Sequence, residues 1–162
     1  MSMIEGKERL ALIVTIFLSI LIMGGCTTTI KYSYDMKISF SERKSYMWDP
    51  LSVEAKQHPL LETNVQALAD RLLAQKGFTR VSENADLMIS MGCEGDFYKE
   101  SYQLSTLTLN IYKMPKENTT EKKELVWRGT AFRTAFSNIN TDAASGDLRK
   151  AVQGILSKFP PK

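Results

Sequence analysis

The sequence holds few of the residues that build metal sites or carry thiol and imidazole chemistry. Among its 162 residues are two Cys and one His. A structural zinc site takes about four Cys or His ligands, so this supply leaves little for a metal centre or for a cysteine or histidine catalyst. We therefore expect no metal site, no cofactor and no catalytic residue of these kinds.

The sequence also contains few glycines and prolines, and neither sign of charge is in large excess. The chain has 9 Gly, 5 Pro, 43% hydrophobic and 24% charged residues, a composition that excludes collagen, a disordered chain and a coiled coil. Its 21 Lys and Arg stand against 18 Asp and Glu, a net charge of +3 without a basic stripe, so nucleic acid is not an expected partner. The length suits one folded domain with a short appendage.

One long hydrophobic run is present, close to the N-terminus. Residues 10–23 (LALIVTIFLSILIM) carry no charge over 14 residues, and Gly24-Gly25-Cys26 follows them. A helix of that length spans about 21 Å, short of the roughly 30 Å hydrocarbon core of a membrane. An apolar run followed by small residues predicts a secretory signal peptide rather than a transmembrane helix.

The residues at the end of this run resemble the lipobox of bacterial lipoproteins. The resemblance rests on Met23-Gly24-Gly25-Cys26. It implies that the Cys26 sulfur receives a diacylglyceryl group and that the chain is cut between Gly25 and Cys26. Each buried CH₂ contributes about 0.8 kcal/mol, so two or three acyl chains would hold the protein on the membrane. The alternative is a buried helix or an uncleaved signal anchor in which Cys26 is incidental.

These predictions divide the chain into three parts: a signal peptide over residues 1–25, a lipidated Cys with a short tether over residues 26–29, and a single domain over residues 30–162. The tether spans about 10 Å at roughly 3.3 Å per residue, so the domain should sit against the membrane. Thr27 is not the Asp that marks inner-membrane retention in enteric bacteria, and the lipoprotein resemblance therefore implies the outer membrane, facing the periplasm. Cys93 would be the one free thiol, and its apolar neighbours predict a buried, inert group rather than a reactive or intermolecularly paired one.

Two segments have helical spacing. An apolar stripe runs over residues 61–73, and Gly77 stands where a C-terminal cap belongs. Residues 148–159 repeat the pattern, with Thr141 or Asp142 as the N-cap and two prolines after the last apolar residue. Both segments are predicted to be helices that bury one face.

Elsewhere the apolar residues recur with a period of two. This alternation predicts strands at residues 30–34, 46–48 and 87–91, and a hairpin built from residues 107–111 and 125–130. The order of elements predicts an α+β fold, a two-layer sandwich in which a mainly antiparallel sheet carries both helices on one face. The other sheet face, rich in Thr, Ser and Asn, is then either solvated or available to a partner.

No arrangement of side chains predicts catalysis. His58 precedes Pro59 in an expected loop, without a second ligand or a nearby nucleophile. Five aspartates fall on separate elements, without the paired spacing of a glycosidase or an aspartic protease: Asp35, Asp49, Asp70, Asp86 and Asp96. We therefore expect a non-enzymatic protein with no catalytic residue, and an enzyme whose site only the fold assembles is the alternative.

Four residues are candidate partner contacts. Phe97, Tyr98 and Tyr102 lie in a polar context, where exposed aromatic rings often serve as contact points. Arg128, on the last predicted strand, can meet a phosphate or carboxylate of a partner. The alternatives are packing of the aromatic rings within the domain and solvated cross-strand charge at Arg128.

A set of short motifs resembles one family of bacterial lipoproteins. In chain order the motifs are Phe40-Ser41, Lys44-Ser45-Tyr46-Met47-Trp48, Lys76-Gly77-Phe78, Ala85-Asp86-Leu87, Leu125-Val126-Trp127-Arg128-Gly129-Thr130-Ala131, Ile155-Leu156 and Phe159-Pro160-Pro161. Through them nearly the whole mature chain resembles the domain-of-unknown-function 4136 family. The resemblance implies an envelope lipoprotein with no assigned activity, and it transfers no catalytic residue.

The expected function is that of a membrane-anchored envelope lipoprotein that binds rather than catalyses. It would act at the periplasmic face of the outer membrane, held there by the lipid on Cys26. Its partner would be an envelope protein or a cell-wall element, bound through the polar sheet face or the aromatic segment. The alternative is a carrier of a lipid or small apolar molecule, which requires a cavity between the sheet and the helices.

Overall fold

The computed structural model describes residues 28–50, 59–97, 102–115, 122–132 and 142–161. The predicted signal peptide, Cys26, His58, Tyr98 and Thr141 lie outside these ranges. The elements are β1 (Thr29–Tyr34), β2 (Ser45–Trp48), α3 (Pro59–Gln75), β3 (Thr79–Arg80), β4 (Leu87–Phe97), β5 (Tyr102–Lys113), β6 (Glu124–Phe132) and α4 (Asp142–Leu156).

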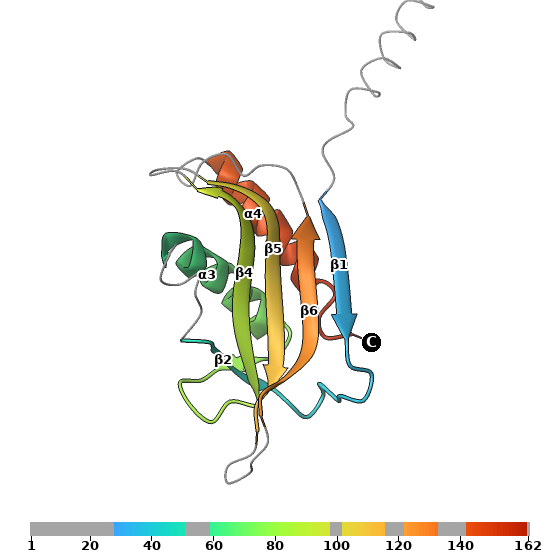
Figure 1. Ribbon diagram of the computed structural model, residues 1–162. Coiled ribbons are helices and arrows are strands. Elements are labelled where there is room, and N and C mark those ends of the chain that lie inside the picture. Colours follow the sequence, from blue (N-terminus) through green and yellow to red (C-terminus); the bar gives the residue numbers. More distant parts are fainter. Residues whose placement is uncertain (1–27, 51–58, 98–101, 116–121, 133–141, 162) are drawn as a thin grey trace, which may run out of the picture.

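One mixed sheet forms the first layer of the fold, and the two helices form the second. The strand order is β1-β6-β5-β4-β2-β3, in which β2 runs parallel to β3 and β4 and the other neighbours are antiparallel. Figure 1 shows both helices behind the sheet, with α4 crossing behind β5 and β6. The predicted α+β two-layer sandwich, with a mainly antiparallel sheet and both helices on one face, is confirmed.

The helix predicted over residues 61–73 is α3, and its end has the predicted cap. Gly77 adopts a φ of 80°, a left-handed conformation that costs glycine little. The Gly77 amide donates to the Ala74 carbonyl at 3.0 Å and the Phe78 amide donates to the Leu73 carbonyl at 3.0 Å. This pair of hydrogen bonds is a Schellman motif, which satisfies two carbonyls that the helix end leaves free.

The central hairpin, β5 with β6, shows the predicted alternation. Leu107, Leu109 and Ile111 are fully buried beneath the helices, while Thr108 and Asn110 between them are half-exposed on the opposite face. Because side chains alternate between the two sheet faces, this pattern assigns one face to the core and the other to solvent.

The short strand β3 and the full length of β4 were not predicted. The structure continues β4 to Phe97, where it pairs with Tyr102, although alternation had indicated a strand only over residues 87–91. A register shift between Glu94 and Gly95 interrupts the alternation of buried and exposed residues, although β4 stays paired with β5 beyond it. Strand β3 has two exposed residues and no hydrophobic pattern to reveal it.

The core between sheet and helices is organised around Phe159, which follows α4. Its ring centroid lies 5.1 Å from that of Phe40, 5.2 Å from Phe78 and 5.2 Å from Trp127. All four aromatic side chains are buried. Each of them belongs to a different one of the short motifs noted in the sequence, so four separate motifs meet at one point of the core.

The backbone approaches this cluster closely at Gly129 in β6. A Cβ atom placed there would lie 2.8 Å from Ile155 Cγ2 and would overlap the ring of Trp127, and both side chains are almost fully buried. Since buried neighbours cannot move aside without disturbing the packing, the absence of a side chain at Gly129 allows α4 to lie directly on β6.

Candidate functional site

The uncovered face of the sheet carries a row of hydrogen-bonded polar side chains across three strands. Arg128 on β6 lies opposite Asn110 on β5, and Asn110 lies opposite Ser90 on β4. The Arg128 Nε donates to Asn110 Oδ1 at 2.6 Å, and Asn110 Nδ2 donates to Ser90 Oγ at 3.4 Å. Within the described ranges no carboxylate pairs with Arg128, so its two terminal nitrogens remain available to a partner.

A second polar row lies beside the first. The Thr108 and Thr130 hydroxyls are 3.0 Å apart, and the Lys31 ammonium lies over the Phe132 ring, 5.2 Å from its centroid. A shallow hollow of about 390 Å³ lies on this face. We call the surface around it the polar sheet face, and it is lined by Gly92, Cys93, Glu94, Thr106, Thr108, Asn110, Arg128, Thr130 and Phe132.

Among the described residues, the structure places the backbones of Phe97 and Tyr102 away from Arg128. The backbones of Phe97 and Tyr102 pair at the far end of the β4–β5 hairpin, whereas Arg128 lies opposite Asn110. Tyr102 and Asn110 lie eight positions apart along β5, roughly 26 Å at 3.3 Å per residue. Tyr98 and the side chains of Phe97 and Tyr102 lie outside what the structure describes. Arg128 is therefore the candidate contact for which the structure supplies a described environment.

Arg128 was predictable as a contact residue from the sequence, but its neighbours on the sheet were not. The alternation of residues predicted that Thr, Ser and Asn share one sheet face. It did not indicate which residue of one strand lies beside which residue of the next. That pairing depends on the register, and β5 and β6 shift register between Ile111 and Tyr112. The only signal in the sequence for Asn110 and Thr130 is their position between apolar residues.

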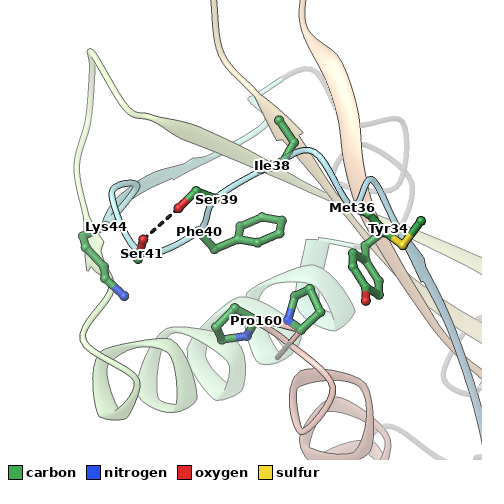
Figure 2. Close-up of a pocket in the computed structure, with 9 residues that line it drawn as sticks. Tyr34, Met36, Ile38, Ser39, Phe40, Ser41, Lys44 and Pro160 are labelled. Carbon is green, nitrogen blue, oxygen red and sulfur yellow. Dashed lines mark hydrogen bonds between the residues drawn. The ribbon is translucent and has the colours of Figure 1, made fainter.

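A second hollow, a groove of about 550 Å³, lies where β1 ends near the C-terminus (Figure 2). Three stretches of chain form it: the end of β1, the segment leading to β2, and the residues after α4. The groove is lined by Tyr34, Met36, Ile38, Ser39, Phe40, Ser41, Lys44, Pro160 and Pro161. We call it the proline groove. No site was predicted here from the sequence.

Asp70 on α3 ties the helix to the edge of the sheet. Its Oδ1 accepts hydrogen bonds from Tyr46 Oη at 2.7 Å and from Trp48 Nε1 at 2.9 Å, and its Oδ2 meets Arg80 at 2.8 Å. Burial, followed by the hydrogen bond to Asp70, raises the pKa of Tyr46 above its ordinary value, so the phenol stays protonated and continues to donate. The carboxylate thus has a structural role, as the acceptor for two buried donors.

Asp86, just before β4, joins the start of β2 to the start of β4. Its Oδ2 accepts from Ser45 Oγ at 2.5 Å and from the amides of Ser45 and Lys44 at 3.0 and 3.2 Å. The Asp86 amide in turn donates to Ser45 Oγ at 2.9 Å. The hydrogen bond from the Ser45 hydroxyl is the main cause that lowers the pKa of Asp86, because it stabilises the ionised form.

Replacing Asp86 by Asn is expected to reduce stability at pH 7 by about 1 kcal/mol, a value discounted because the carboxylate is exposed to solvent. A pKa that is lower in the folded state adds stability above the unfolded pKa of about 4, and this contribution disappears as the pH falls through the folded pKa. The difference in stability between the unaltered protein and Asp86→Asn should therefore be largest near pH 7 and should shrink as the pH falls.

Urea denaturation of both proteins between pH 7 and pH 2.5 measures this gap. The Glu83→Gln variant, which changes an exposed carboxylate nearby, should show no such convergence. A gap that stays constant as the pH falls would contradict the assignment.

Within the described parts of the chain, no group of three or more His, Cys, Asp or Glu side chains could hold a metal ion. Cys93 forms no disulfide and is half-buried against the core, so the predicted burial of this thiol is partial. Over the same residues no helix has both the length and the hydrophobicity that crossing a bilayer requires.

A comparison with models of protein families identifies the family of this chain. The model of the domain of unknown function DUF4136 matches residues 30–161. The chain belongs to the DUF4136 family. The resemblance noted in the motifs is thereby confirmed, and the match spans every element described above except the first residue of β1. A search of curated protein sequences finds no match to this chain.

Solved structures share the fold. A PDZ domain protein from Parabacteroides distasonis has a TM-score of 0.58 and 14% identity over 83% of this chain, which spans only 36% of that protein. A DUF4136 family protein from Bacteroides thetaiotaomicron has a TM-score of 0.55 and 14% identity over 82% of this chain and 96% of its own. A PelC dodecamer from Paraburkholderia phytofirmans is more distant, with a TM-score of 0.48 and 15% identity over 81% of this chain and 95% of that one. For the first two structures, at 14% identity, the similarity establishes the fold alone.

Proposed function

We propose that this DUF4136 protein is a lipid-anchored, non-enzymatic envelope protein that binds an envelope protein or cell-wall partner through the polar sheet face. The observation that carries the proposal is the row from Arg128 through Asn110 to Ser90 on the side of the sheet that the helices leave uncovered. The hydrogen bond from Nε orients the Arg128 guanidinium, and its two terminal nitrogens can still donate to a partner. A pre-oriented guanidinium can bind a carboxylate or phosphate of the partner in a bidentate manner.

A lipid anchor at Cys26 would hold the start of β1 close to the membrane. Strand β1 begins at Thr29, three residues after Cys26, and pairs there with Phe132 at the end of β6. About 10 Å of chain joins the lipid to the sheet, at roughly 3.3 Å per residue. The end of the sheet that carries Thr29 and Phe132 would then lie near the membrane. The polar sheet face would extend from that end along β5 and β6 into the periplasm.

Among the described residues, no cavity between the sheet and the helices favours the carrier alternative. A carrier needs space between the sheet and the helices. There the structure places a continuous cluster of buried apolar side chains, in which Leu109, Val152 and Ile155 are fully buried. Because these side chains fill the layer between sheet and helices, the binding role has the stronger support.

Cross-linking in intact cells tests this proposal. The full chain, tagged at its C-terminus, is purified after mild cross-linking beside the Cys26→Ser and Arg128→Glu forms. The matched control is Arg149→Glu, which reverses the charge of an exposed arginine on α4, on the other layer of the fold. We expect the unaltered and Arg149→Glu proteins to capture the same specific partner. Arg128→Glu should capture at least tenfold less, equivalent to about 1.4 kcal/mol of binding energy.

The Cys26→Ser form separates the anchor from the contact surface. It should leave the membrane fraction and lose the partner in cells, and intact mass should show the lipid adduct on the unaltered protein alone. Equal capture by Arg128→Glu and Arg149→Glu would contradict the role of the polar sheet face. An unaltered protein that still begins at Met1 without lipid would contradict the anchor.

A further inference from the structure

We propose that the proline groove binds an extended peptide segment of a partner protein, one with apolar side chains beside an acidic residue. Figure 2 shows Pro160 below and the segment from Ile38 to Ser41 above, with Tyr34 and Met36 at one end and Lys44 at the other. The groove therefore has apolar surfaces along its length and a single cation at one end. The inference concerns a site separate from the polar sheet face and stands without the anchor.

Two apolar side chains of the groove are exposed to solvent rather than packed into the core. Met36 is 86% exposed and Tyr34 is 38% exposed. The conformational flexibility of methionine suits it to binding surfaces that adapt to a partner. The two prolines and the Tyr34 ring add apolar surface with little freedom to lose on binding, which lowers the entropic cost of ordering the site.

The cation at the end of the groove selects the charge of the ligand. The Lys44 ammonium lies over the Phe78 ring, 4.7 Å from its centroid. Among the described residues no carboxylate side chain forms an ion pair with it, although the Lys44 backbone amide donates to Asp86. A lysine held on an aromatic ring beside an apolar groove is complementary to a carboxylate that neighbours apolar groups.

The open form of the groove favours a peptide over an acyl chain. The groove is open to solvent, so a bound acyl chain would remain partly in water and gain little of its transfer free energy. A peptide backbone tolerates water, and its amides can bond to the hydroxyls of Ser39 and Ser41, which lie 2.7 Å apart on one wall. An extended chain also presents alternate side chains toward the prolines and Tyr34.

Selection from a peptide library tests the inference. The probe is a library of random heptapeptides with blocked ends, and the target is the full chain in lipid nanodiscs. We expect enrichment of peptides that combine apolar residues with Asp or Glu. An enriched peptide should bind at least tenfold more weakly to Met36→Glu and to Lys44→Glu, and replacing its acidic residue by the amide should have a similar effect.

The matched control is Lys37→Glu, which reverses an exposed lysine on the same segment that does not line the groove. It should bind the peptide as the unaltered protein does. Unaltered far-UV circular dichroism in all three variants shows that they fold, and the Met36 methyl resonance should shift on titration of the peptide into the unaltered protein.

Three results would overturn the inference: no enrichment, enrichment of peptides without acidic residues, or equal losses in Lys37→Glu and Lys44→Glu. Oleate serves as the acyl-chain probe. Saturable oleate binding that Met36→Glu abolishes, in the absence of any selected peptide, would assign the groove to a lipid instead.

Discussion

Replacing Phe159 by Ala is expected to lower the free energy of unfolding by about 3–5 kcal/mol, the range for a buried Phe reduced to Ala. The side chain is 1% exposed and contacts three other aromatic rings from separate parts of the chain. Its removal would leave a cavity bordered by Phe40, Phe78 and Trp127, and would also remove ring interactions worth roughly 0.5–1.5 kcal/mol each. Since a domain of this size is stable by only about 5–15 kcal/mol, the loss is large.

Chemical denaturation followed by far-UV circular dichroism measures this loss. The matched control is Phe132→Ala, which removes the same side chain from the polar sheet face, where it is 37% exposed. Its cost should be about 1 kcal/mol or less, because the ring loses its contact with Lys31 but leaves no cavity in the core. Similar losses in the two variants would show that Phe159 does not organise the core as described.

Replacing Asp70 by Ala is expected to cost about 2–4 kcal/mol of stability. The change leaves the Tyr46 hydroxyl and the Trp48 indole N–H without their acceptor, and both side chains are buried. An unsatisfied buried donor costs about 1–3 kcal/mol. The lost ion pair with Arg80 adds little, because the Arg80 side chain is 51% exposed.

Two companion variants separate these contributions. Asp70→Asn retains an oxygen that can accept from both Tyr46 and Trp48, so it should cost only about 1 kcal/mol. Arg80→Ala removes the ion pair alone and should cost about 1 kcal/mol or less. The three free energies of unfolding, measured by urea denaturation, should rank with Asp70→Ala as the least stable. A loss in Asp70→Ala no greater than in Arg80→Ala would contradict the role assigned to the carboxylate.

The elements that could be predicted are those whose residues carry a complete local pattern. The stripe over residues 61–73 and the glycine after it correspond to α3 and its cap, because helical periodicity and the left-handed conformation at Gly77 are properties of a few neighbouring residues. Strand β3, with two exposed residues, has no such pattern and forms because β2 lies beside it. The parallel pairing of β2 with β4 likewise depends on residues about 40 positions apart.

The candidate sites divide in the same way. Arg128 was recognisable because it stands in a strand with clear alternation. Its hydrogen bond to Asn110 depends on how β5 and β6 align, and a one-residue slip would place the two side chains on different faces. The proline groove had no signal in the sequence, since Tyr34, Lys44 and Pro160 belong to segments that only folding brings together.

The sequence by itself determined the family, the α+β class and the two faces of each long element, because all of these depend on residue types and local periodicity. Only the tertiary structure decided that four motif aromatics meet at Phe159, that Asp70 and Asp86 are occupied by structural hydrogen bonds, and that an exposed groove ends at Lys44. The physical reason is that these contacts join residues far apart in the chain. Their geometry follows from strand register and the packing of the helices on the sheet, which local preferences do not specify.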